Sequence, residues 1–187
     1  MKPQSLVLAL IGTAFALGGC QSSGDRAPIT GYLDGLDQQL STFEQALVAH
    51  AADVKGAASL GGVMDMEKAH AADAQTQMGE MSAGIDHMGM CTDPDGHSPD
   101  TGGMHQLAAD AMKECGRHDA AMQAAGDMMS AQEEETQHQA AMADLLTGMK
   151  QARDEMADQE TMAGAGMHMC DMGDPAGDGS MGSSMGP

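Results

Sequence analysis

Apolar residues recur at alternating three- and four-residue spacing along four long stretches of the chain. The first stretch runs on from Tyr32, and the second follows a Ser-Leu-Gly-Gly break at 59–62. Such spacing places the apolar residues on one face of an amphipathic helix. Between the second and third stretches, residues 92–103 are rich in Gly, Pro, Asp and Ser, which indicates a loop. The pattern predicts α-helices over 31–58, 63–90, 104–129 and 131–163.

The second half of the chain repeats the pattern of the first. A shift of 68 positions superposes three polar residues of each half, and much of the apolar face coincides as well. Duplication of a helical hairpin explains this simply. We therefore predict an all-α, up-down-up-down four-helix bundle. Its two hairpins would be 31–91 and 104–163, joined by the loop 92–103. The superposed polar residues are His50, Glu67 and His70 in the first half and His118, Glu135 and His138 in the second.

The composition restricts both the core and the partners. The chain has no Trp, one Tyr, two Phe and 21 Met, so the core must be built mainly from Leu, Ala and Met. Methionine is an adaptable core residue, and it is also a soft thioether ligand. The formal net charge of −20 disfavours nucleic acid and anionic lipid headgroups as partners. We therefore expect no nucleic-acid binding.

The first twenty residues have the features of an export signal. Lys2 precedes an apolar run at 6–11 that is too short to span a bilayer. The sequence Leu17-Gly18-Gly19-Cys20 resembles the bacterial lipobox. The resemblance implies that residues 1–19 are a cleaved signal peptide, that Cys20 is acylated and that 20–30 is a lipidated tether. It also implies a cell-envelope location with the lipid bilayer as a partner, on the periplasmic face of the outer membrane in a Gram-negative cell. The alternative is an ordinary signal peptide with a chance cysteine.

The superposed polar residues fall on the apolar faces of their helices. In an antiparallel hairpin, residues equally far from the turn lie level, so His50 faces His70 and His118 faces His138. Each Glu-x-x-His pair puts a carboxylate and an imidazole one turn apart on the same helix face. All six side chains should therefore meet in one layer of the bundle. A metal ion would offset the cost of burying them, with Zn, Cu and Fe all suitable. Alternatively, they form a metal-free polar layer that sets helix register.

The order of these residues resembles that of the ferritin-like di-metal carboxylate bundles. In that family, helices one and three each supply one Glu, and helices two and four each supply a Glu-x-x-His pair. The resemblance extends to Glu67, His70, Glu135 and His138. His50 and His118 stand where the family has Glu, so oxygen chemistry does not carry over directly.

Each hairpin ends in a cluster of sulfur and imidazole side chains. In an oxidising compartment, Cys91 and Cys170 at these equivalent ends would form a disulfide. The alternative is a soft site for Cu(I) or a similar ion. We expect 164–187, rich in Met, Gly and Asp, to be a flexible tail. The candidate soft-metal residues are His87, Met88, Met90, Cys91, Met167, His168, Met169 and Cys170.

Together these features predict an exported lipoprotein that binds one or two transition-metal ions in its bundle, for sequestration or homeostasis. A purely structural envelope lipoprotein is the main alternative. A di-metal oxidase or peroxide-handling enzyme is a third hypothesis, although the pattern does not require catalysis. The sequence contains no phosphate-binding loop or nucleotide-binding fingerprint.

Overall fold

The computed structural model describes residues 26–162 and 168–171, which form a bundle of four long helices and two short strands. The predicted all-α four-helix bundle is confirmed, and each predicted helix overlaps its observed counterpart along most of its length. The helices are α1 (Thr30–Gly56), α2 (Leu60–Gly89), α3 (Gly102–Ala124) and α4 (Met128–Met162), and the strands are β1 (Arg26–Pro28) and β2 (Met169–Asp171).

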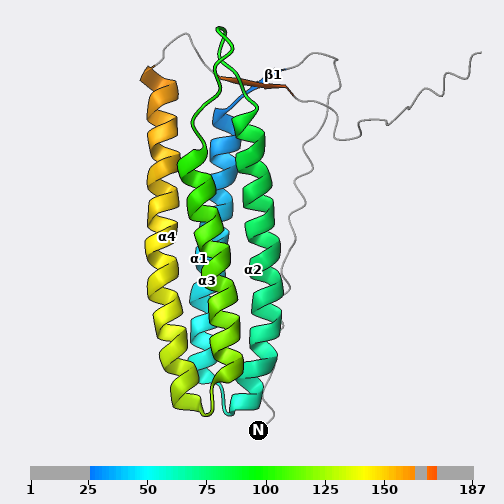
Figure 1. Cartoon of the computed structure of the whole chain (residues 1–187), viewed down its shortest axis with the longest axis vertical. Helices are drawn as coiled ribbons and strands as arrows, with labels where there is room; N and C mark the ends of the chain where they lie inside the picture. Colours follow the sequence, from blue (N-terminus) through cyan, green and yellow to red (C-terminus); the bar gives the residue numbers. More distant parts are fainter. Residues whose placement is uncertain (1–25, 163–167, 172–187) are drawn as a thin grey trace, which may run out of the picture.

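Two short turns at one end of the bundle create the two antiparallel hairpins (Figure 1). The Ser59 hydroxyl caps α2 by accepting a hydrogen bond of 3.2 Å from the Gly62 N–H. The Asp127 carboxylate accepts one of 2.8 Å from the Ser130 N–H in the first turn of α4. Such caps satisfy N–H groups that a helix leaves unpaired at its start. The hairpins pack so that α1 and α3 each contact both α2 and α4.

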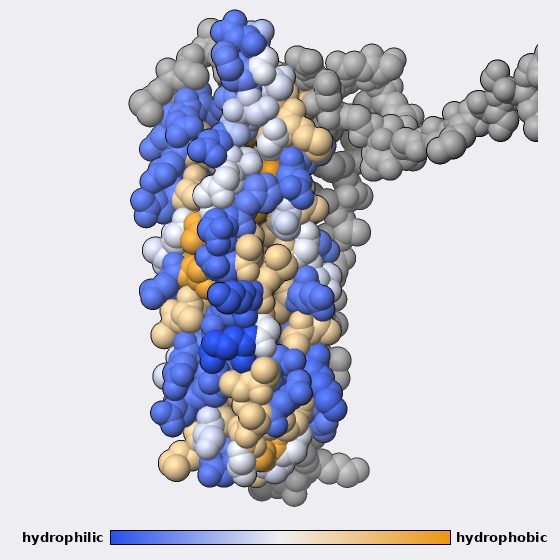
Figure 2. Space-filling view, viewed as in Figure 1, coloured by the Kyte–Doolittle hydropathy of each residue, from blue (hydrophilic) through white to orange (hydrophobic). Residues whose placement is uncertain are grey.

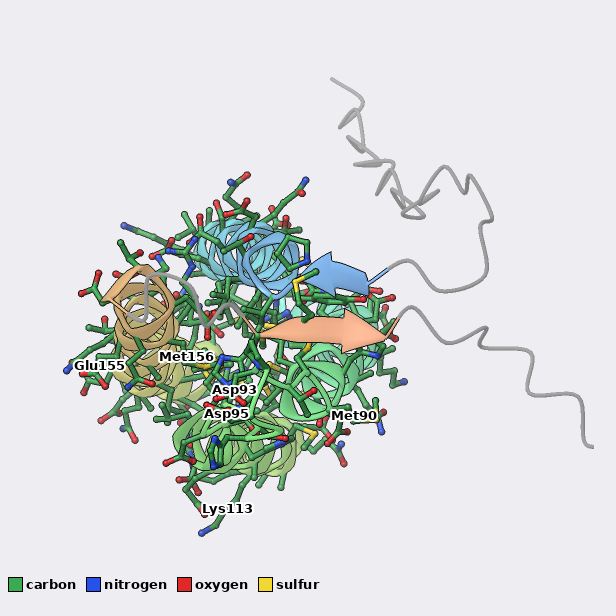
Figure 3. All side chains as sticks on the ribbon, turned by 90° about the horizontal axis from the view of Figure 1, so that it is seen from above. Met90, Asp93, Asp95, Lys113, Glu155 and Met156 are labelled. Atoms are coloured by element: carbon green, nitrogen blue, oxygen red, sulfur yellow. A yellow bond between two sulfur atoms is a disulfide. The ribbon has the colours of Figure 1, made fainter. Side chains whose placement is uncertain are left out.

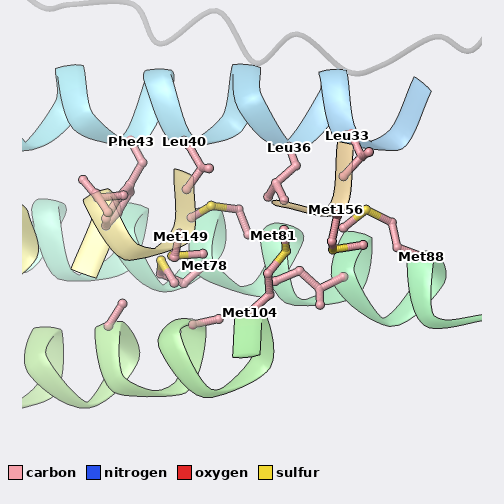
Figure 4. Close-up of a cluster of buried hydrophobic side chains, with 14 of the residues drawn as sticks. Leu33, Leu36, Leu40, Phe43, Met78, Met81, Met88, Met104, Met149 and Met156 are labelled. Atoms are coloured by element: carbon pink, nitrogen blue, oxygen red, sulfur yellow. The ribbon is translucent and has the colours of Figure 1, made fainter. Parts of the chain in front are cut away.

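Two hydrophobic clusters fill the bundle on either side of a polar layer. Along α1, Leu47 belongs to the larger cluster, His50 to the polar layer and Val54 to the smaller cluster. The larger cluster packs leucines and Phe43 of α1 against methionines of the other helices (Figure 4). Only four buried residues make up the smaller cluster, which lies on the turn side of the layer: Val54, Val63, Met122 and Ala131.

The opposite end of the bundle is closed by a small antiparallel sheet. Strands β1 and β2 lie across this end in the end-on view of Figure 3, and Ala27 pairs with Cys170. A disulfide joins Cys170 to Cys91, just beyond α2. Residues 26–30, assigned above to the tether 20–30, and residues 168–171, assigned to the tail 164–187, lie in or beside β1, α1 and β2. Backbone pairing between β1 and β2 and the disulfide hold these residues in place. Strands of three residues are too short to show a periodic pattern in the sequence.

Most charged side chains face outward, as the amphipathic pattern requires. In Figure 3, Glu155 and Lys113 point away from the bundle, whereas Met156 points inward. Hydrophilic side chains cover much of the α3 and α4 surface seen in Figure 2, and hydrophobic ones emerge between the helices. No helix in 26–162 combines the length and apolar character that membrane crossing needs. The predicted signal peptide 1–19 and the lipidation site Cys20 lie outside the described residues.

Candidate metal centre

Six polar side chains occupy the layer between the two hydrophobic clusters, and every helix contributes to it. One imidazole comes from α1 and one from α3, and a Glu-x-x-His pair comes from each of α2 and α4. The helices deliver these side chains inward because they continue the apolar spacing. His70 is partly buried. The exposed fractions of the other five are 7% for His50, 2% for Glu67, 1% for His118, 4% for Glu135 and 0% for His138.

Two imidazole nitrogens and two carboxylate oxygens lie close together at the centre of this layer. The Nε2 atom of His50 lies 3.1 Å from Glu67 Oε2 and 3.3 Å from Glu135 Oε2. The Nε2 atom of His118 lies 3.4 Å from Glu67 Oε2 and 3.3 Å from Glu135 Oε2. Ligand atoms of His50, His118 and Glu135 all lie within 4.8 Å of one another. This buried group could hold a metal ion.

The four nitrogen-to-oxygen contacts of His50 and His118 have the distances of hydrogen bonds, but their angles are not those of hydrogen bonds. Neither His50 Nε2 nor His118 Nε2 has a hydrogen-bond partner among the described residues, although each lies close to two carboxylate oxygens. This is expected if each ring nitrogen is directed between the carboxylates rather than at one of them. Most buried polar atoms in proteins are paired. Seven unpaired buried atoms belong to the layer: His50 Nε2, both Glu67 oxygens, His70 Nε2, His118 Nε2, Glu135 Oε2 and His138 Nε2.

His70 and His138 form a second rank behind the central imidazoles. The His70 ring stacks on His50 with a centroid separation of 3.8 Å, and the His138 ring stacks on His118 at 4.0 Å. Among the described residues, the imidazoles that lie within ion-pair distance of Glu67 or Glu135 are those of His50 and His118. The six side chains predicted to bind metal together thus share one layer, with four of them at its centre and two behind. Ring stacking separates His70 and His138 from the four central groups.

Protonation can balance the charge of the layer. Burial lowers the pKa of His50, but its contacts with Glu135 and Glu67 outweigh burial and raise the pKa to about 9. The same opposing effects raise the pKa of His118 to about 10. Burial raises the pKa of Glu67, yet contacts with His118 and His50 bring it down to about 2, and the pKa of Glu135 is lowered as well. Two imidazolium groups then face two carboxylates.

The second-rank imidazoles stay neutral in this arrangement. Burial and the neighbouring His50 lower the pKa of His70 to about 4. Burial and His118 lower the pKa of His138. The layer can thus reach neutrality with protons alone, so the cost of burying its charges does not by itself demand a metal ion.

A group of polar side chains outside the apolar faces supports the layer. Glu114, which precedes His118 by one turn, contacts His138 Nδ1 at 3.1 Å. Sequence reasoning missed two further contacts. Glu134 Oε1 lies 3.3 Å from His118 Nδ1, and Gln139 donates a hydrogen bond of 2.8 Å to Glu135 Oε1. Glu134 and Gln139 each lie next to a predicted ligand in the sequence. They do not continue the apolar spacing of the helix, so the periodic pattern did not identify them.

The sulfur-rich ends do not assemble as a soft-metal site among the described residues. The disulfide uses the sulfur atoms of Cys91 and Cys170, which are then no longer thiolate ligands. Met88 is buried in the larger cluster, whereas Met90 is 66% exposed. His168 pairs instead with the buried carboxylate of Glu160, and Met169 lies in β2, where it pairs with Pro28 and Thr92. The His87 ring packs against the Tyr32 ring in a tilted arrangement, and Met167 lies outside the described residues.

Comparisons of the chain with protein-family models, curated protein sequences and solved structures yielded no match. The function must therefore be argued from the site.

Proposed function

We propose that this chain is an exported lipoprotein that sequesters a transition-metal ion through His50, Glu67, His118 and Glu135. One observation carries the proposal. In a tetrahedral zinc site with bonds of about 2.0–2.1 Å, neighbouring ligand atoms lie about 3.3–3.4 Å apart. The four nitrogen-to-oxygen separations of the layer are 3.1, 3.3, 3.4 and 3.3 Å. Each nitrogen-to-oxygen pair thus has the spacing of neighbouring ligands around one small ion. His50, His118 and Glu135, whose ligand atoms all lie within 4.8 Å of one another, form the tightest group.

The ligand types favour binding over catalysis. Imidazole and carboxylate together suit Zn, Cu and Fe. Catalytic zinc sites keep one coordination position open for water or substrate, whereas four protein ligands fill a tetrahedral ion. With Glu67 as a fourth ligand beside His50, His118 and Glu135, no position would stay open, which favours storage or sequestration over the oxidase hypothesis.

The lipoprotein part of the proposal is supported by the leader. Cys20 directly follows Gly18 and Gly19, as the lipobox resemblance requires. In the cell, Cys20→Ala should leave unprocessed precursor and abolish labelling by radioactive fatty acid. Labelling that survives this substitution would refute the lipid anchor without affecting the metal proposal.

A metal-free polar layer is the second candidate function, favoured by the charge balance described above. With His50 and His118 protonated, the layer is an ion-pair network that sets helix register without any ion. The two candidates differ in what metal does to the folded protein. An ion that binds only the folded state raises its stability by mass action, by about 2.7 kcal/mol at a free concentration one hundred times the dissociation constant.

Thermal melting with and without metal separates these candidates. We expect Zn(II), Cu(II), Fe(II) or Mn(II) to raise the melting temperature of the metal-free protein, and a chelator to reverse the rise. Replacing both His50 and His118 by Ala should abolish the rise. The control is His105→Ala, which replaces a histidine outside the layer that lies 3.5 Å from Asp86. A melting temperature insensitive to all four ions would exclude metal binding and leave the structural candidate.

A further inference from the structure

The two halves of the layer are supported unequally. In the second hairpin, each imidazole has a carboxylate behind it: Glu134 contacts Nδ1 of His118, and Glu114 contacts Nδ1 of His138. An Nδ1–H group that donates to a carboxylate leaves Nε2 with its lone pair free for a metal ion. Contact at Nδ1 thus holds the His118 ring with its Nε2 atom toward the centre of the layer, and it holds His138 behind that ring.

Arg117 joins these two supports. Its guanidinium makes two hydrogen bonds with Glu114, of 2.7 and 2.6 Å, and a third contact of 2.7 Å with Glu134. The oxygens it binds, Oε1 of Glu114 and Oε1 of Glu134, are the same atoms that contact the imidazoles. A planar guanidinium fixes carboxylates in a defined geometry, which a flexible ammonium does not. One side chain thus sets the position of both carboxylates and, through them, both rings.

The first hairpin lacks this arrangement. The 68-residue shift that superposes the ligands replaces each supporting residue by a small or apolar one. Glu67 accordingly has no hydrogen bond to either oxygen among the described residues, whereas Glu135 Oε1 is held by Gln139. The positions equivalent to Glu114, Arg117, Glu134 and Gln139 are Ala46, Ala49, Met66 and Ala71.

We propose that Arg117 is the positioning residue of the metal centre. Through Glu114 and Glu134 it fixes the side chains of the second hairpin before the ion arrives, whereas Glu67 and His50 of the first hairpin have no such support. This inference rests on the proposed function, because it concerns the same ion. Arg117 itself is 44% exposed in its side chain and contacts no central ligand, so its effect on metal is indirect.

Metal affinity in Arg117→Ala tests the proposal. Loss of outer support around a metal site costs 10–100-fold in affinity, and we expect a loss of that order in competition titrations with a Zn(II)-binding dye. The matched control is Arg153→Ala, which removes an equal charge. Arg153 contacts Asp34, Asp154 and the Leu33 carbonyl, none of which belongs to the layer. Its affinity should stay within about twofold of that of the unsubstituted protein.

Further readouts separate positioning from a general loss of stability. Arg117→Lys should recover part of the affinity, because an ammonium keeps the positive charge but cannot hold two carboxylates in the fixed geometry of a planar guanidinium. The visible spectrum of bound Co(II) should change in Arg117→Ala and stay unchanged in Arg153→Ala. If Arg117→Ala does not fold, Glu134→Gln, which retains side-chain size, should give the same loss of affinity and change of spectrum.

The outcomes also distinguish this inference from the proposed function. Equal affinity and equal Co(II) spectra in Arg117→Ala and the unsubstituted protein would overturn the positioning role alone. A loss of affinity equal to that in Arg153→Ala would overturn it too, because charge alone would then suffice. Absence of metal binding by the unsubstituted protein would overturn both.

Discussion

Removing one charge from the layer should destabilise the metal-free protein strongly, and Glu67→Gln is the sharpest such change. Glu67 Oε2 lies 3.1 Å from His50 Nε2 and 3.4 Å from His118 Nε2, and the side chain is 2% exposed. The amide keeps the size of the carboxylate but cannot compensate two imidazolium groups. Breaking a buried ion pair from one side costs about 3–5 kcal/mol. That is a large fraction of the roughly 5–15 kcal/mol by which domains are stable.

Removing all four central groups together should have the opposite outcome. Replacing a buried ionic network by well-packed apolar residues is neutral or stabilising by about 1–4 kcal/mol. The quadruple substitution of Leu for His50, Glu67, His118 and Glu135 should therefore match or exceed the stability of the unsubstituted protein. It should also remove every effect of metal on the melting temperature.

Urea denaturation followed by circular dichroism, with chelator present, measures both changes. The control is Glu44→Gln, which removes an exposed ion pair with Lys150. Exposed pairs contribute about 0–1 kcal/mol. If Glu67→Gln costs no more than Glu44→Gln, the layer does not hold two charged imidazoles against two carboxylates, and the charge assignment is refuted.

Three further predictions concern pH, the disulfide and the core. Because the pKa values of His50 and His118 are raised to about 9 and about 10, their stabilisation is complete below the ordinary pKa of 6.5. It is lost as pH rises through those values, so with chelator present the melting temperature should fall between about pH 8 and 11; a flat profile there would contradict this. Replacing Cys91 and Cys170 together by Ser should cost up to about 4.5 kcal/mol by loop entropy, since 79 residues separate them; an unchanged urea midpoint would disprove it. Phe43→Ala should cost about 3–5 kcal/mol because the side chain is 1% exposed, whereas a cost near that of the exposed Val48→Ala would show a loosely packed core.

The helices and the six side chains of the polar layer could be predicted because both follow one periodic rule. His50 continues the spacing of Leu47 and Val54, so burial of the imidazole follows from the helix itself. The shift of 68 then identified the partner residues on α3 and α4. Spacing along a helix says nothing about ring rotation, however, and for that reason the stacking of His70 behind His50 could not be foreseen.

Other parts of the structure depend on contacts that leave no periodic trace. Arg117 and Glu134 each lie one residue before a ligand, where a helical residue points away from the apolar face. Their function arises only because α3 and α4 pack side by side. Strands β1 and β2 are three residues each and pair across almost the whole chain, so no local pattern announces them. Glu160 is buried at 6% exposure because it pairs with His168 beyond the end of its helix.

The small apolar cluster on the turn side of the layer bears on how quickly an ion could leave. Proteins open locally at a free-energy cost below that of global unfolding, and a region with few buried apolar contacts opens most easily. Four buried residues, with five partly buried ones packed against them, lie between the layer and the two turns. Twenty buried residues and the disulfide-linked sheet close the other side. Opening of the turn end, rather than unfolding of the bundle, would then set the residence time of the ion. If the layer holds an ion as proposed, the ion could be exchanged while most of the fold stays intact.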